Sequence, residues 1–218
     1  MTSPLAVFDC DGTLVDGQGA VVAAMESAFR QTGLAVPDPH LVRRMVGLSL
    51  PQAVARLARE ASAEQVREAV AAYKTAFRAA REAGTLAEPL FPGIAALLDD
   101  LAAAGWTMAV ATGKSDRGLA HCLASHGIAD RFTSLQTAER HPSKPDPAML
   151  EAALFETDTA PEAAVMIGDT AYDMAMAAAI GVRAVGVAWG YHEGPELIAA
   201  GAAYVARDAA DLKEYLLQ

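Results

Sequence analysis

Two aspartates near the N-terminus have the type and spacing of a catalytic pair. Asp9 and Asp11 follow an apolar run, residues 5–8, which predicts a short buried strand that ends in a glycine-bearing turn. Because side chains alternate along a strand, both carboxylates leave it on one face and Cys10 leaves it on the other. Two neighbouring acids repel each other unless a cation or a proton lies between them. A fold does not need this arrangement for stability, so the pair predicts a functional site.

Three more polar segments follow strand-like runs later in the chain. They hold a threonine with a glycine, a lysine beside a proline, and a second pair of aspartates: Thr112 and Gly113, Lys144 and Pro145, Asp169 and Asp173. Ligands of open α/β sheets bind at the carboxyl ends of the strands. We therefore expect these segments to meet Asp9 at one edge of a sheet.

The elements that must position these residues alternate after Pro92. The sequence predicts helices over residues 94–104, 116–125, 147–155 and 171–179, strands over 107–111, 132–135, 164–167 and 184–187, and a last strand and helix within 203–217. Such alternation predicts an α/β fold, a Rossmann-like parallel sheet with helices on both faces.

The segment between the first strand and this region predicts helices only. Their ranges are residues 20–30, 41–46, 51–60 and 63–82. We expect residues 17–85 to form a small helical cap domain over the aspartates, and residues 1–16 and 86–218 to form the catalytic core. Four arginines make the cap locally basic and offer cations for a distal anionic group of a substrate: Arg43, Arg44, Arg56 and Arg59.

Composition narrows the class of protein. With 53% hydrophobic and 20% charged residues, the 218-residue chain can bury a sizeable core. A net charge of −10 argues against nucleic acid or an anionic membrane as the main partner. Two cysteines form no disulfide framework, and no apolar run is long enough to span a bilayer. We expect a cytoplasmic protein, either a monomer or a homodimer.

The ordered motifs resemble those of the haloacid dehalogenase superfamily of phosphotransfer enzymes. The resemblance rests on Asp9-Cys10-Asp11-Gly12-Thr13, Thr112-Gly113, Lys144-Pro145 and Gly168-Asp169-Thr170-Ala171-Tyr172-Asp173 in this order. The helical insert is similar to the cap of one subgroup. Residues 45–50, 186–191 and 201–205 are similar to phosphoglycolate phosphatases, whereas residues 16–19 replace their usual serine-bearing entry into the cap.

The resemblance implies a catalytic pair that divides phosphate ester hydrolysis into two steps. Asp9 would attack phosphorus and form an aspartyl-phosphate. Asp11 would protonate the departing alkoxide and then deprotonate the water that cleaves the intermediate. In the family, dehalogenases lack this second aspartate, so Asp11 favours phosphoryl over carbon–halogen chemistry.

The remaining motifs imply a metal site and a phosphate site. Mg²⁺ would be held by Asp9, the backbone carbonyl of Asp11, Asp169 and Asp173, the last of them directly or through water. Phosphate would be bound by the nucleophile, the first turn, the threonine motif and the lysine: Asp9, Gly12, Thr13, Thr112, Gly113 and Lys144. Thr112 and Lys144 would also stabilise the charge that builds up during transfer.

The sequence thus predicts a magnesium-dependent phosphatase of a small phosphorylated metabolite, of which 2-phosphoglycolate is one candidate. A phosphosugar mutase similar to β-phosphoglucomutase and a pyrophosphatase stay open. Phosphonate cleavage would need a cap lysine, for which Lys74 is the only candidate. A non-catalytic phospho-switch or metabolite-binding domain is the alternative of another class, against which the cap and Asp11 count.

Overall fold

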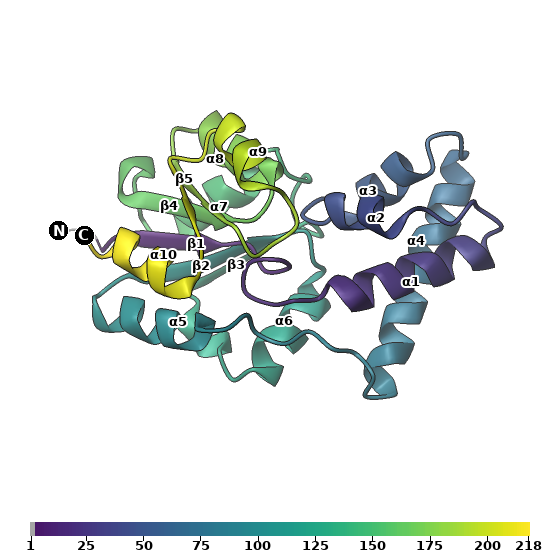
Figure 1. Cartoon of the computed structure of the whole chain (residues 1–218), viewed down its shortest axis with the longest axis horizontal. Helices are drawn as coiled ribbons and strands as arrows, with labels where there is room; N and C mark the ends of the chain where they lie inside the picture. Colours follow the sequence, from purple (N-terminus) through teal and green to yellow (C-terminus); the bar gives the residue numbers. More distant parts are fainter. Residues whose placement is uncertain (1–2) are drawn as a thin grey trace.

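The computed structural model describes residues 3–218 as a sheet-based core and a group of four helices beside it (Figure 1). The core holds a six-stranded parallel sheet in the order β3-β2-β1-β4-β5-β6. Its strands are β1 (Leu5–Phe8), β2 (Thr107–Thr112), β3 (Ser134–Thr137), β4 (Ala164–Gly168), β5 (Arg183–Val187) and β6 (Tyr204–Ala206). Strand β1 lies between β2 and β4, where the strand order reverses direction, which is where open α/β sheets bind ligands.

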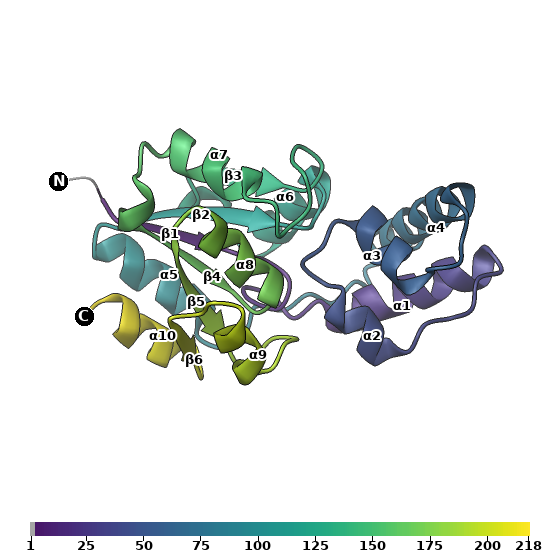
Figure 2. The ribbon, with the colours of Figure 1, turned by 90° about the horizontal axis from the view of Figure 1, so that it is seen from above.

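Helices cover both faces of the sheet (Figures 1 and 2). They are α5 (Ile94–Ala103), α6 (Asp116–Ser125), α7 (Ala148–Glu156), α8 (Ala171–Ala179), α9 (Gly194–Ala199) and α10 (Ala209–Leu216). Ala6 and Phe8 of β1 belong to the apolar cluster with α5, α6 and α10. Leu5 and Val7 belong to the cluster with α7, α8 and α9. The predicted parallel sheet with helices on both faces is confirmed.

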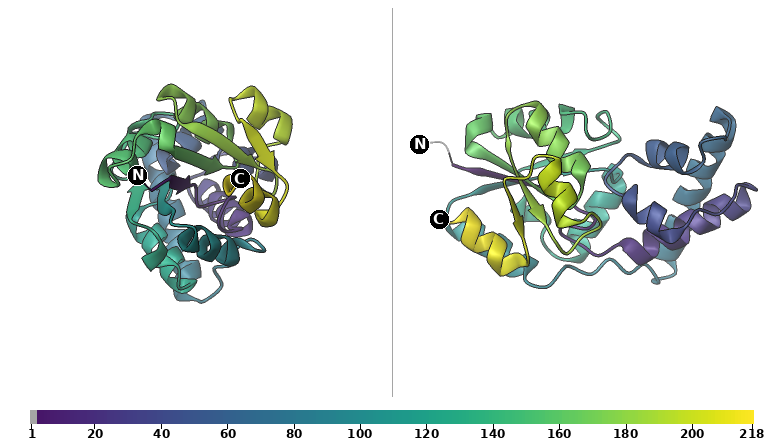
Figure 3. Two further views of the ribbon diagram at one scale, coloured as in Figure 1. Left: turned by 90° about the vertical axis from the view of Figure 1, so that its left-hand side faces the viewer. Right: turned by 45° about the horizontal axis from the view of Figure 1, so that its top comes forward.

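The cap consists of α1 (Gln18–Gln31), α2 (Pro39–Arg44), α3 (Leu50–Leu57) and α4 (Ala63–Glu82). Figure 3 shows these helices extending from one end of the core, opposite α10. Helix α4 begins with a capping box between Ser62 and Gln65. Neither α4 nor any other helix within residues 3–218 has the length and apolar character needed to cross a membrane. A helical cap inserted after the first strand was expected and is found, while its limits at residues 17–85 stay a prediction.

One local prediction was wrong, and one short helix was missed. Strand β3 begins at Ser134, two residues later than expected, because Ala129–Arg131 form a 3₁₀ turn before it. Phe132 is buried and packs edge-on against Phe8, with 6.3 Å between ring centroids. Helix α9 was not expected, since its six residues are too few to show a helical apolar period.

Candidate active site

The carboxyl ends of the three central strands bring the predicted residues together. Asp9 follows β1, Thr112 ends β2, and Asp169 follows β4. Asp173 lies in the first turn of α8, and Lys144 lies in the loop between β3 and α7. Residues from four separate segments of the chain therefore meet at one edge of the sheet.

Asp9 is held at one oxygen and open at the other. Its side chain is 1% exposed, and its Oδ1 accepts a hydrogen bond from the backbone N–H of Cys10 at 2.7 Å. Lys144 Nζ lies 3.0 Å from the same oxygen. Among the described residues, Asp9 Oδ2 has no hydrogen-bond partner. Burial raises the pKa of Asp9 to about 7 even though Lys144 lowers it in part. A buried carboxylate oxygen without a partner is costly, so it is available for a ligand.

Lys144 joins two carboxylates inside the core. Its side chain is fully buried, and its Nζ lies 2.6 Å from Asp173 Oδ1 as well as 3.0 Å from Asp9. Burial alone would lower the pKa of Lys144, but Asp173 and Asp9 outweigh it and hold the pKa above the usual value. The other oxygen of Asp173 accepts from the backbone N–H and the hydroxyl of Thr170, at 3.1 and 2.7 Å. The ammonium and the start of α8 together fix the orientation of Asp173.

Asp169 is fixed by two donors in a tightly packed turn. Its Oδ1 accepts from the hydroxyl of Thr13 at 3.1 Å, and its Oδ2 accepts from the backbone N–H of Tyr191 at 2.9 Å. Gly12 has a φ of +89°, and a Cβ there would lie 2.2 Å from Asp169 Oδ2, so only glycine fits. Burial, together with the charges of Asp9 and Asp173, raises the pKa of Asp169 well above its usual value. The structure thus places Gly12 and Thr13 against Asp169, and their phosphate-binding role stays a prediction.

Three of the aspartates fit a divalent cation. Asp9, Asp169 and Asp173 each offer one oxygen, and these oxygens lie within 4.8 Å of one another. Within residues 3–218, Lys144 pairs with Asp9 and Asp173, no ion pair reaches Asp169, and Asp9 Oδ2 has no hydrogen-bond partner. Hard cations such as Mg²⁺ prefer carboxylate oxygens. The donor set therefore suits such a cation, and its identity as magnesium stays a prediction.

Asp11 takes part in a second buried network that the sequence did not reveal. Lys114 Nζ lies 2.9 Å from Asp11 Oδ1 and 2.6 Å from Glu88 Oε1. Glu88 belongs to the segment that returns from α4 to α5. Burial raises the pKa of Asp11, and Lys114 offsets part of this effect. Lys114 stands next to the predicted Thr112-Gly113 turn, which was a visible signal, whereas Glu88 follows no motif.

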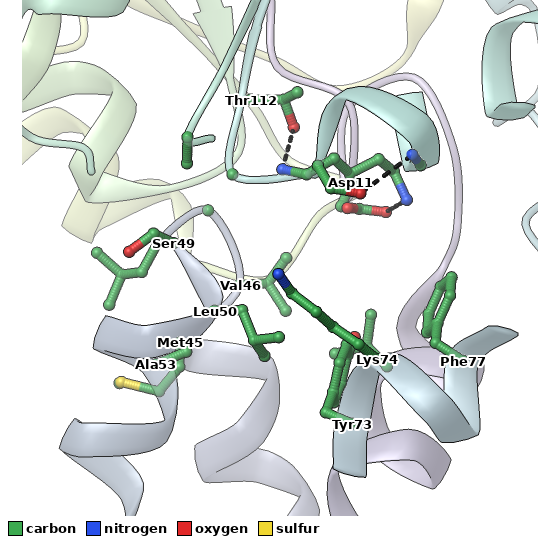
Figure 4. A pocket seen from close by; sticks show the side chains of 18 of the residues that line it. Asp11, Met45, Val46, Ser49, Leu50, Ala53, Tyr73, Lys74, Phe77 and Thr112 are labelled. Atoms are coloured by element: carbon green, nitrogen blue, oxygen red, sulfur yellow. Dashed lines mark hydrogen bonds and ion pairs between the residues drawn. The ribbon is translucent and has the colours of Figure 1, made fainter. Parts of the chain in front are cut away.

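A cavity of about 390 Å³ lies between the core and the cap. Four predicted residues line it, Asp9, Asp11, Thr112 and Gly113. Figure 4 shows Asp11 and Thr112 on one side and residues of the cap helices on the other. A Cβ on Gly113 would lie 2.5 Å from the carbonyl oxygen of Leu48, so the backbone of the cap packs directly on this glycine.

Polar contacts around the cavity hold the cap against the core. The backbone N–H of Ser49 donates to Ser143 Oγ at 2.7 Å. Arg44 forms a bidentate pair with Glu196, at 3.0 and 2.9 Å. Arg56 donates to the Tyr172 hydroxyl at 3.3 Å. Two of the four cap arginines thus contact the core, and other cations line the cavity instead, namely Lys74, Arg78 and Arg81 of α4.

Comparison with known proteins gives one consistent family. The model of the haloacid dehalogenase-like hydrolase family matches residues 6–187. The probable phosphatase IndB of Dickeya dadantii is 35% identical over 202 residues, which are 90% of this chain and 86% of IndB. The phosphoglycolate phosphatase of Rhodospirillum rubrum is 34% identical over 221 residues, covering 96% of this chain and 89% of that protein.

The chain is also similar to a protein with a kinase name and to a solved structure. The tyrosine-protein kinase PtkA of Mycobacterium tuberculosis is 35% identical over 188 residues, which are 86% of this chain but only 62% of PtkA. The crystal structure of a predicted phosphatase from Clostridium acetobutylicum has a TM-score of 0.89 at 24% identity, and covers 100% of this chain and 99% of that one. At this identity the structural likeness concerns the fold alone.

Proposed function

The chain belongs to the haloacid dehalogenase-like hydrolase family, and on this premise we propose that it is a metal-dependent phosphatase of a small phosphorylated metabolite. The observation that carries the proposal is Asp9 Oδ2, a buried carboxylate oxygen that has no hydrogen-bond partner among residues 3–218, on a residue that lines the cavity together with Asp11. A nucleophile needs such a free oxygen, whereas a structural aspartate would have it satisfied.

In the first step, Asp9 Oδ2 attacks phosphorus and the P–O bond to the leaving alcohol breaks. The leaving oxygen takes a proton from Asp11, so the alcohol departs neutral and Asp9 carries the phosphoryl group. In the second step, Asp11 takes a proton from water, whose oxygen attacks phosphorus and releases inorganic phosphate and free Asp9.

The surroundings of the two aspartates suit these different tasks. Lys144 stabilises the ionised form of Asp9 and would neutralise the transferring phosphoryl oxygens, which the Thr112 hydroxyl and the N–H of Gly113 would also contact. Burial raises the pKa of Asp11, which suits a group that must donate a proton near neutral pH. A divalent cation on Asp9, Asp169 and Asp173 would supply further positive charge next to the phosphate.

The names of the relatives support a phosphomonoester as substrate. One relative is a probable phosphatase and another a phosphoglycolate phosphatase, so 2-phosphoglycolate belongs among the compounds to test. The kinase name of PtkA supports a second candidate, in which the phosphoryl group on Asp9 passes to an acceptor other than water. The phosphosugar mutase considered above is a reaction of the same kind.

The test is phosphate release by the purified protein, with Mg²⁺ or with a chelator, from 2-phosphoglycolate, sugar phosphates, nucleoside monophosphates and pyrophosphate. We expect release that needs Mg²⁺ and falls by about 10⁴-fold in Asp9→Asn, as loss of a covalent nucleophile implies. Asp130→Asn is the matched control, because Asp130 is exposed and lies outside the site. No release from any compound would contradict the phosphatase. Phosphorylated Asp9 in that case would favour transfer to another acceptor.

A further inference from the structure

The cavity that begins at Asp9 and Asp11 continues into the cap, and most of the cap residues that line it are apolar. The wall is formed mainly by side chains from all four cap helices and the loop after α2, among them Met25, Val42, Val46, Leu50, Tyr73 and Phe77. Figure 4 shows Val46 and Leu50 on one side of the space below Asp11, and Tyr73 and Phe77 of α4 on the other. A two-carbon acid would use almost none of this surface.

Apolar side chains that border an unfilled space destabilise the fold, and this indicates that a ligand fills the space. Met25 and Val42 are 2% and 1% exposed, so they belong to the interior of the cap, and both line the cavity. Apolar atoms that border a void lack packing partners, which destabilises a fold. The volume of about 390 Å³ falls within the range of about 300–1,000 Å³ that is usual for ligand pockets. A substrate group that extends from the active site into this space would restore the packing contacts that these side chains lack.

An aromatic wall starts beside the proposed general acid. Lys114 Nζ lies 2.9 Å from Asp11 Oδ1 and 5.8 Å from the centroid of the Phe77 ring. The Tyr73 ring is nearly parallel to that of Phe77, with 5.7 Å between centroids and 21° between planes. The leaving oxygen must approach Asp11, so the group attached to that oxygen would extend along these two rings.

We propose that the substrate is a phosphomonoester whose leaving alcohol carries a ring-sized, largely apolar body that packs against Phe77 and Tyr73. This inference rests on the proposed phosphatase function and narrows its substrate class. Three cations of α4, Lys74, Arg78 and Arg81, line the same cavity. Figure 4 shows Lys74 reaching into the space, where its Nζ lies 3.8 Å from Glu139 Oε1. The Arg81 guanidinium lies over the Phe77 ring, 5.9 Å from its centroid, so both of these cations already have partners in the cavity wall. Contacts remote from phosphorus contribute to the rate when they help to orient the reacting group, so a truncated alcohol should be turned over poorly.

The experiment compares ethyl phosphate with 2-phenylethyl phosphate, whose leaving alcohols have similar acidity, and includes 2-phosphoglycolate. Burial of one ring should raise kcat/KM at least tenfold for 2-phenylethyl phosphate over ethyl phosphate, on the order of what its apolar area predicts. Equal values for the two alkyl phosphates, or a preference for 2-phosphoglycolate over 2-phenylethyl phosphate, would overturn the inference while leaving the phosphatase intact.

Variants locate the effect. Phe77→Ala should lower the ratio of kcat/KM values, 2-phenylethyl over ethyl phosphate, by at least fivefold, and Phe77→Leu should lower it less. Phe155→Ala is the matched control, since Phe155 on α7 is 86% exposed and is not among the residues that line the cavity. An unchanged ratio in folded Phe77→Ala would refute the assigned wall.

Failure of the phosphatase itself gives a different result. If no phosphoester, including p-nitrophenyl phosphate, is hydrolysed, the proposed function fails, and calorimetry of the two alkyl phosphates decides the inference. At least tenfold tighter binding of 2-phenylethyl phosphate would support the apolar pocket, and equal affinities would overturn it.

Discussion

The core and the cap differ in the burial and packing of the side chains that face the cavity. In the core, the functional side chains of Asp9, Lys144, Asp169 and Asp173 are at most 1% exposed, and ion pairs or hydrogen bonds hold each of them. The cap has one small cluster of five buried apolar residues, and much of its inner surface borders the cavity. On the proposed function, the chemistry takes place among tightly held side chains, and the leaving group is selected by a wall that borders open space.

The ion pairs differ in the same way. A buried pair that loses one partner leaves an uncompensated charge in a medium that solvates it poorly, which is strongly destabilising. Half-exposed pairs such as Arg44 with Glu196, whose side chains are 32% and 38% exposed, contribute little because water screens them. The effects of substitutions should therefore be largest in the core, smaller in the segment that joins α4 to α5, and smallest at the rim of the cap.

The largest effect is expected for Lys144→Met. It leaves Asp9 and Asp173 buried without their common partner, so we expect a loss of about 3–5 kcal/mol in the free energy of unfolding. Turnover should fall by about 10³-fold or more, because the phosphoryl group loses the positive charge of Lys144. Denaturant unfolding and phosphate release measure the two effects.

The matched control for this substitution is Lys213→Met, whose lysine is 45% exposed in its pair with Asp100. Its stability should stay within about 0.5 kcal/mol of the wild type. If both variants unfold alike, the contrast between the buried and the exposed pair fails.

Stability of the metal-free protein should depend on pH through the buried aspartates of the core. Burial raises the pKa of Asp9 from 3.8 to about 7, and raises those of Asp11 and Asp169 as well. The folded state then binds more protons than the unfolded state between about pH 4 and 7, so these groups destabilise it as the pH rises through that range. We expect Tm to fall by several degrees from pH 5 to pH 7.5 without metal.

Added Mg²⁺ should reverse this loss at pH 7.5, because a cation that binds only the folded state stabilises it. Asp9→Asn should flatten the dependence of Tm on pH. A Tm that rises over the same interval would show that the aspartates are not held in the protonated form by burial.

The sequence was sufficient for residues whose position follows from periodicity and topology. Asp9 and Asp11 follow a four-residue buried strand, and Asp169 follows a second one, so the rule that parallel strands end at one edge brings them together. The helical character of the cap followed from apolar spacing alone. These features depend on local patterns that a sequence displays directly.

What the sequence did not reveal depends on the path of irregular segments. The pairing of Lys114 with Glu88 requires the return segment from the cap to pass beside the β2 turn, and no local pattern encodes that path. The aromatic wall is equally hidden, because Tyr73 and Phe77 have the same helical spacing whether they fill a core or line a cavity. Only the packing of α4 against the other cap helices separates these outcomes.

Glu88→Gln tests the segment that joins α4 to α5. We expect its effect to lie between the effects of substitutions in the core and at the rim of the cap. The negative charge of Glu88 raises the pKa of Asp11, so its removal should lower that pKa. Asp11 must be protonated to act as the acid, hence the alkaline limb of the kcat profile should move to lower pH, with a loss of a few-fold at pH 8 and less at pH 6. Glu82→Gln, at an exposed residue at the end of α4, is the control and should leave the profile unchanged.

The smallest effect is expected at the rim, for Arg44→Gln and Glu196→Gln. Their bidentate pair holds the cap against α9, and the Arg44 guanidinium lowers the pKa of Glu196 to about 2. Each substitution should raise KM by about two- to fourfold at constant kcat, and the double-mutant cycle should give a coupling of at most about 1 kcal/mol that weakens with salt. A larger coupling that resists salt would mean that this contact is as tightly held as the buried network around Lys144. The cap would then be a fixed wall of the site rather than its adaptable half, because the free energy needed to open it would approach that of disrupting the core.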